Sequence, residues 1–122
     1  MKEIEELIDG MEEELKEIRR YFHSHPELSN QEFATADRIC EYLDRWGVEY
    51  ERGIAGTGIV AMVRGKKTGK TVGIRADMDA LPVEEENDVP YRSEQPGVMH
   101  ACGHDAHMTV LLGAAKVFQT MR

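Results

Sequence analysis

The residues best suited to chemistry lie in one short stretch, from His100 to His107. This stretch contains three of the five histidines, one of the two cysteines and an aspartate. Neutral imidazole, thiolate and carboxylate are the groups that bind a borderline-soft divalent metal such as zinc. Gly103 separates Cys102 from His104, and because glycine has no Cβ the backbone can turn so that both side chains reach one ion. The pattern predicts a metal-binding loop at the start of a helix.

Residue type alone leaves five candidate ligands in this loop: His100, Cys102, His104, Asp105 and His107. A closed structural zinc site needs four ligands, commonly from two separated pairs. The only other histidine pair, His23 and His25, is better explained by the end of a helix. A thiol enzyme would need Cys102 paired with a histidine base from a distant part of the fold. The residues therefore favour a metal site that is completed by other parts of a larger chain.

Two amphipathic helices are predicted in the N-terminal part of the chain. Apolar residues three and four positions apart predict a helix over residues 2–23, which Pro26 ends. The S-x-x-E pattern at 29–32 matches a capping box and predicts a second helix from about 30 to 46. Gly47 is placed as the C-terminal stop of that second helix.

A small sheet is predicted in the middle of the chain. Residues 48–51 alternate between apolar and polar and predict a half-exposed strand. The apolar runs 59–63 and 71–76 predict two strands buried on both faces and joined as a hairpin. Asp77 and Asp79 follow the second run directly, where open α/β sheets collect functional groups. A polar turn would explain these two aspartates equally well.

The C-terminal part combines a long irregular connection, 82–98, with a last helix over about 105–120. Loops of that length inside a compact domain are often functional. Asp105 is placed to cap the last helix, and apolar residues cover most of the helix circumference, so we expect the helix to be buried. A stand-alone chain of this kind is expected to leave an apolar sheet edge uncovered.

Composition excludes several classes of protein. The 122 residues, with 41% hydrophobic and 31% charged residues, predict one globular domain. A net charge of −8 argues against nucleic acid or an anionic membrane as a partner, and no segment has the apolar length of a bilayer span. Cys40 and Cys102 make no disulfide framework, and the N-terminus lacks a signal-peptide pattern, so a cytoplasmic location is expected.

Three ordered motifs resemble the aminoacylase/carboxypeptidase-like metallopeptidase family, in the amidohydrolase branch that includes hippurate hydrolases, N-acyl-amino-acid amidohydrolases and auxin-conjugate hydrolases. The motifs are H-S-H-P-E-L at 23–28, G-I-R-A-D-M-D-A-L-P at 73–82 and M-H-A-C-G-H-D-A-H at 99–107. The resemblance runs from about residue 15 to the end. It implies that residues 1–122 form the N-terminal part of an α/β/α zinc-peptidase-like catalytic domain, in the order helix, helix, strands, helix, without the lid and dimerisation domain.

The same resemblance implies a two-metal amidohydrolase. Cys102 and His104 match metal ligands, and Asp79 matches the aspartate that supports the metal centre. Asp77 falls where other branches carry a histidine ligand, and it is not assigned to the metal. His107 and Asp105 are expected to fix the loop and cap the helix.

Catalysis in this family implies two divalent ions, of zinc, manganese, cobalt or nickel, that polarise the amide carbonyl of an N-acyl amino acid or short peptide and activate water. The general-base glutamate and the remaining ligands match no residue of this chain, and Glu84, Glu85 and Glu86 match no family motif. The chain alone is therefore expected to be inactive and to bind metal weakly. The full-length form is expected to be a homo-oligomer.

Two alternatives stay open. A non-catalytic binding or assembly module would keep the fold, and the purified chain would then be soluble and of defined oligomeric state. A thiol enzyme would use Cys102, and an alkylating agent would then inhibit it whereas a chelator would not.

Overall fold

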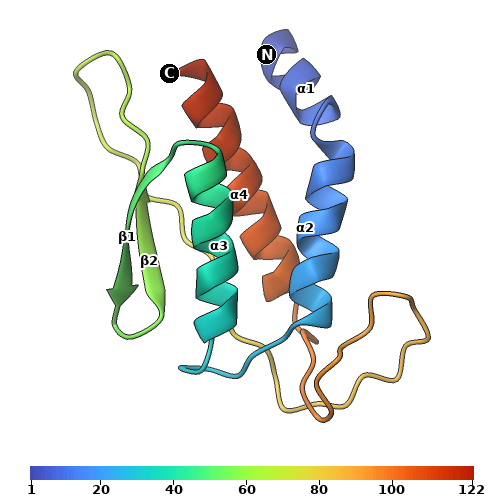
Figure 1. Ribbon diagram of the computed structural model, residues 1–122. Helices are drawn as coiled ribbons and strands as arrows, with labels where there is room; N and C mark the ends of the chain where they lie inside the picture. Colours follow the sequence, from blue (N-terminus) through green and yellow to red (C-terminus); the bar gives the residue numbers. More distant parts are fainter.

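Four helices and one β-hairpin make up the computed structural model, which describes residues 1–122. The elements in chain order are α1 (Lys2–Asp9), α2 (Glu12–Ser24), α3 (Phe33–Arg45), β1 (Glu49–Ile54), β2 (Gly58–Met62) and α4 (His104–Met121). Figure 1 shows α4 between α2 and α3, the hairpin beside α3, and both chain termini at the same end. No helix combines the length and the apolar character needed to cross a membrane.

The hydrophobic core lies where α2, α3 and α4 meet. Phe22 of α2 and Tyr42 of α3 pack edge to face, with ring centroids 6.3 Å apart. Eight buried side chains form one cluster: Ile18, Phe22, Ile39, Tyr42, Leu43, Val48, Met108 and Leu112. Burying one large apolar side chain stabilises the fold by about 2 kcal/mol. This core therefore fixes α4, and with it the loop that precedes α4, against the other two helices.

The single helix predicted over 2–23 is wrong, because the structure breaks it into α1 and α2 at Gly10 and Met11. The Met11 N–H reaches back only three residues, to the Ile8 carbonyl at 2.9 Å, which makes a tight turn. Glycine costs about 1 kcal/mol relative to alanine inside a helix. The break also turns the buried Met11 side chain toward Gly113 of α4. The predicted end of the helix before Pro26 is confirmed.

The second predicted helix is confirmed as α3, but its capping box, at 29–32, is wrong. No side chain of that pattern caps the helix. The carboxylate of Glu27 accepts hydrogen bonds from the backbone N–H groups of Ala34, at 3.2 Å, and Thr35, at 2.6 Å. The predicted stop is correct, since Gly47 has φ 68°, a conformation that glycine adopts without steric cost.

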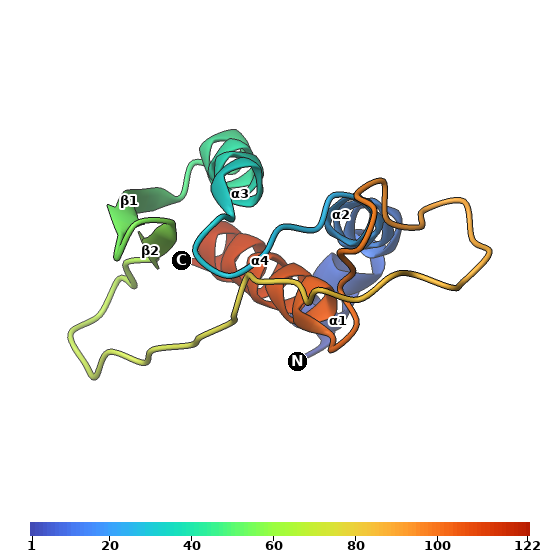
Figure 2. The ribbon, with the colours of Figure 1, turned by 90° about the horizontal axis from the view of Figure 1, so that it is seen from below.

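The predicted hairpin of two buried strands, 59–63 with 71–76, is wrong. β2 pairs instead with β1, antiparallel, with Glu49 opposite Met62, and residues 71–76 form no strand. A strand buried on both faces needs other elements on both faces, and this chain supplies none here, so Val72 is 81% exposed. In Figure 2 the segment after β2 runs away from the helices before it returns beneath α4. The uncovered apolar surface agrees with the expectation for a stand-alone chain.

α4 is buried on one face only, which corrects the prediction that most of its circumference is covered. Val110 is 70% exposed, and Phe118 is also exposed. The N-cap is Gly103, with φ 131°, and Asp105 does not cap the helix. The Asp105 side chain turns toward α2, where its Oδ2 atom lies 2.8 Å from Nδ1 of His23.

Candidate metal centre

Backbone hydrogen bonds bring the three sequence motifs together. The N–H of Leu81 donates to the Met99 carbonyl at 2.9 Å, and the Met99 N–H donates to the Leu81 carbonyl at 3.0 Å. The Ala80 N–H donates to the Glu27 carbonyl at 2.8 Å. These bonds join 23–28, 73–82 and 99–107, which lie far apart in the sequence, at the start of α4.

His104 is held by Asp79. The Nδ1 atom of His104 lies 2.9 Å from the backbone oxygen of Asp79 and 3.0 Å from its carboxylate oxygen Oδ1. Both neighbours are acceptors, so Nδ1 carries the proton, and the Nε2 lone pair is left free to bind a metal. A histidine that donates its other N–H to a carboxylate or carbonyl is the usual arrangement of a metal-binding imidazole. The Nε2 atom lies 3.8 Å from Oδ2 of Asp77, so Asp77 and Asp79 face different sides of the ring.

Cys102 supplies an exposed, free thiol two residues before His104. The turn predicted at Gly103 is present, since its φ of 131° is a conformation that favours glycine. Exposure leaves the sulfur accessible to a metal ion, whereas Cys40 is buried in α3. One thiol and one imidazole of fixed tautomer fit a borderline-soft divalent metal.

The five candidate ligands of the loop do not converge. No three side chains among the histidines, cysteines, aspartates and glutamates are arranged to hold a metal ion. The His107 ring centroid lies 6.1 Å from that of His104, and Asp105 points into the protein. The chain therefore provides part of a donor set rather than a closed site.

His100 is buried at the start of the loop, with neither ring nitrogen hydrogen-bonded. Burial lowers its pKa to about 4, because the charged ring would lose solvation, while the nearby Asp105 opposes the shift and His23 adds to it. His100 is therefore neutral at pH 7.

The sequence did not predict a largely buried ion-pair cluster behind the loop, made of Arg19, His23, Glu85 and Asp105. His23 lies in the last turn of α2 as predicted, but its side chain belongs to this cluster. The interpretation of Asp105 as a cap is wrong. The Nδ1 atom of His23 lies 2.8 Å from Asp105 Oδ2, and its Nε2 atom lies 2.8 Å from Glu85 Oε2. The Nε atom of Arg19 donates to the same Asp105 oxygen at 3.1 Å. One signal could have indicated the cluster: Arg19 and His23 are four residues apart and therefore share a helix face.

Glu85 is ionised in this cluster. Burial alone would raise its pKa, but hydrogen bonds from His23, the Ser93 N–H and Asn87 outweigh burial and lower the pKa to about 2. The carboxylate can therefore only accept hydrogen bonds at neutral pH.

Comparison with known proteins connects this geometry to a family. Residues 73–122 match the family model of peptidase family M20/M25/M40. The chain is 47% identical over 122 residues to the N-acyl-L-amino acid amidohydrolase of Geobacillus stearothermophilus, covering 99% of this chain and 33% of that protein. It is 48% identical over 118 residues to thermostable carboxypeptidase 2 of Saccharolobus solfataricus, covering 90% of this chain and 30% of that protein.

The structure resembles that of the Bacillus subtilis YXEP protein, a dinuclear metal-binding peptidase from the M20 family, with a TM-score of 0.89 and 37% sequence identity. The match covers 93% of this chain and 32% of that chain. The predicted fold class, part of an α/β domain like that of this peptidase, is confirmed. The chain spans about a third of the length of the curated relatives it matches.

Proposed function

We propose that this chain, which on these matches belongs to peptidase family M20/M25/M40, supplies one part of the two-metal centre of an amidohydrolase. The family predicted from the three motifs is confirmed. One relative is an N-acyl-L-amino acid amidohydrolase and another is a carboxypeptidase. We infer hydrolysis of an N-acyl amino acid or short peptide as the activity of the full-length protein, meaning this chain with any coding sequence that adjoins it.

The contact between Asp79 and His104 carries this proposal. Asp79 holds Nδ1 through two oxygens, at 2.9 and 3.0 Å, and thereby presents Nε2 as a ligand. The exposed thiol of Cys102 is the second donor, and its thiolate is the form that binds metal. The sequence predicted these roles for Asp79, Cys102 and His104 through the family resemblance, and the geometry supports them.

Two divalent ions, drawn from zinc, manganese, cobalt and nickel, would polarise the scissile amide carbonyl and lower the pKa of a bound water. Cys102 and His104 would hold part of this metal pair, and Asp79 would fix the His104 ring. We assign residues 1–122 to the catalytic domain. The general base, a glutamate, would come from outside these residues. We also propose a homo-oligomeric, cytoplasmic protein, because apolar side chains are exposed and both cysteines are free thiols.

The test uses chelator-sensitive hydrolysis of N-acetyl amino acids by the full-length protein, followed by amine release. We expect His104→Ala and Cys102→Ser to lower kcat/KM at least about 100-fold, since each removes a metal ligand. Cys40→Ala is the matched control, because Cys40 is the other cysteine and lies far from the loop in the sequence. Its kcat/KM should stay within about threefold of the wild type.

Three outcomes would contradict the proposal. The first is activity that survives a chelator but is abolished by iodoacetamide, which would favour a thiol enzyme. The second is full activity of the His104→Ala variant. The third is strong chelator-sensitive turnover by the 122-residue chain alone. We expect no turnover from this chain, because it provides only part of the metal ligands.

A further inference from the structure

The charged cluster of Arg19, His23, Glu85 and Asp105 lies directly behind the metal loop. The His23 side chain is almost fully buried and sits between two carboxylates, one from α4 and one from the loop 82–98. Arg19, one turn earlier on α2, donates to the same Asp105 oxygen as His23. The cluster thus has two basic and two acidic members. The Arg19 side chain is partly exposed, whereas the other three side chains are buried, and an unpaired charge among those three would be costly.

Both ring nitrogens of His23 are hydrogen-bonded. Glu85 is ionised, so its oxygen can only accept from Nε2. Asp105 accepts on both oxygens, from the Ala106 N–H at Oδ1 and from Arg19 at Oδ2, and its Oδ2 atom lies 2.8 Å from Nδ1 of His23. His23 therefore makes two short contacts to carboxylates, and because Glu85 is ionised, the bond between Nε2 and Glu85 is charge-assisted.

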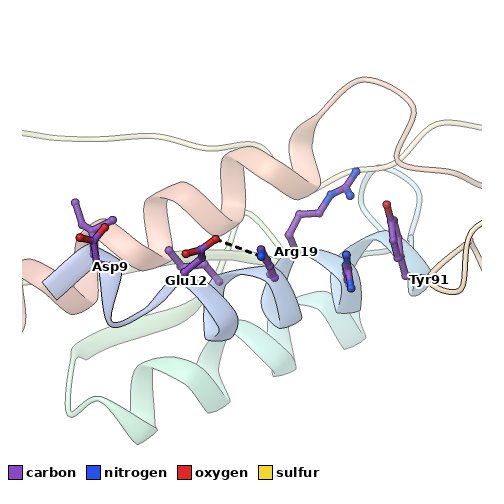
Figure 3. A pocket seen from close by; sticks show the side chains of 8 residues that line it. Asp9, Glu12, Arg19 and Tyr91 are labelled. Carbon is purple, nitrogen blue, oxygen red and sulfur yellow. Dashed lines mark ion pairs between the residues drawn. The ribbon is translucent and has the colours of Figure 1, made fainter. Parts of the chain in front are cut away.

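The cluster also fixes the long loop 82–98 to α2. Arg92 donates to the Glu85 carbonyl at 2.8 Å, and the Ser93 N–H donates to the Glu85 carboxylate. The Tyr91 ring of the same loop lies under the guanidinium groups of Arg19 and Arg20, at 5.4 and 4.7 Å from the ring centroid. Figure 3 shows Arg19 and Tyr91 side by side at one end of a pocket of about 470 Å³, with Asp9 and Glu12 farther along it.

Asp105 transmits this anchorage to the metal loop because it is the residue after His104. It is 1% exposed, and its carbonyl accepts the Thr109 hydroxyl at 2.8 Å, which fixes it in the first turn of α4. A planar peptide unit joins Asp105 to His104, so a shift of one moves the other. The His104 ring is restrained by Asp79 and its backbone by Asp105.

We propose that His23 is a positioning residue for the metal centre, whose two hydrogen bonds hold Asp105, and through it the Cys102–His104 loop, against the loop 82–98. The inference rests on the proposed function, because it requires Cys102 and His104 to be ligands. His23 binds neither metal nor substrate. Substitution of groups that orient metal ligands typically lowers metal affinity about 10–100-fold.

Cobalt(II) titration of the full-length protein tests the inference, because thiolate-to-cobalt absorption reports the Cys102 contact independently of turnover. We expect His23→Gln to weaken Co²⁺ binding about 10–100-fold and to change the absorption spectrum. His25→Gln is the matched control, two residues away in the same motif. His25 is partly exposed and contacts Tyr21, Ser24 and Glu94 but no member of the cluster. Its Co²⁺ affinity and spectrum should equal those of the wild type.

The outcomes separate this inference from the proposed function. A wild-type protein without thiolate-to-cobalt absorption would overturn both. A wild type that shows the absorption, together with a folded His23→Gln variant of unchanged affinity and spectrum, would overturn the positioning role alone. Circular dichroism checks folding.

If His23→Gln does not fold, Glu85→Gln provides the same comparison, because its amide oxygen still accepts from Nε2 while one charge of the cluster is lost. Weakening by roughly threefold to tenfold is expected, since a bond to a neutral acceptor is about half as strong as a charge-assisted one. Unchanged Co²⁺ affinity in this variant would also overturn the inference.

Discussion

The two sides of the metal loop differ in how completely this chain supports them. On the helical side, α2, α3 and α4 bury a continuous core, and the cluster around His23 satisfies its charged members with short hydrogen bonds. On the strand side, the segment 71–76 that leads to Asp77 and Asp79 has no strand partner, and its apolar side chains face solvent. On the helical side, these residues make all the contacts that hold the metal loop in place. On the strand side, the loop depends on contacts that these residues do not make.

The largest effect is expected on the helical side, from Asp105→Ala. This substitution leaves the buried His23 side chain and the half-exposed Arg19 side chain without the carboxylate that they share. Removing one partner of a buried ion pair costs about 3–5 kcal/mol. Urea unfolding measures the loss in the free energy of unfolding. Asp37→Ala is the matched control, because Asp37 pairs with Arg52 on the surface and exposed pairs contribute about 1 kcal/mol or less. If the two variants lose the same free energy of unfolding, the cluster stabilises the fold no more than an exposed ion pair does.

The next effect concerns pH, through His100. Its folded pKa, about 4, lies below the ordinary value of 6.5, so the unfolded chain binds a proton that the folded chain does not. The contribution of His100 to the free energy of unfolding is therefore fully present above pH 6.5. As the pH falls from 6.5 to 4, the free energy of unfolding decreases by about 3 kcal/mol. Unfolding free energies at pH 7, 5.5 and 4 test this.

A His100→Phe variant isolates the contribution of His100 to that pH dependence. Phenylalanine has no titrating group and fits a buried site, so its stability should fall less between pH 6.5 and 4. Glu85 acts in a lower window, since its pKa of about 2 lies below the ordinary 4.5. Its stabilisation is present above pH 4.5 and lost toward pH 2. The same pH slope above pH 4.5 in wild type and His100→Phe would contradict the assignment to His100.

The contrast between the two sides also explains what the sequence could predict. The helices depend on apolar spacing and on local signals such as Gly47, so α3 and α4 were predicted close to their observed positions, and α2 was predicted correctly at its C-terminal end only. The strand at 71–76 was predicted wrongly, because a strand forms only beside another strand, and periodicity carries no information about a partner.

The site shows the same limit. The Asp79–His104 contact joins residues 25 positions apart, and it was expected from the family motifs rather than from spacing. The His23–Asp105 contact spans 82 positions and matches no local rule. Asp105 resembles a helix cap by position, but its Oδ2 atom instead contacts His23 at 2.8 Å and Arg19 at 3.1 Å, both on α2.

The smallest effect is expected on the strand side, from Val72→Asp. Val72 is 81% exposed, and substitutions at such positions usually change stability by less than about 0.5 kcal/mol. The 122-residue chain should therefore keep its unfolding midpoint, and light scattering should show less self-association, because the substitution adds charge to an exposed apolar segment. In the full-length protein, further strands that cover this segment would make the same substitution cost several kcal/mol, since an unpaired carboxylate would be buried. An equally small effect in both forms would mean that the strand side stays open, and that the metal centre is supported from the helical side alone.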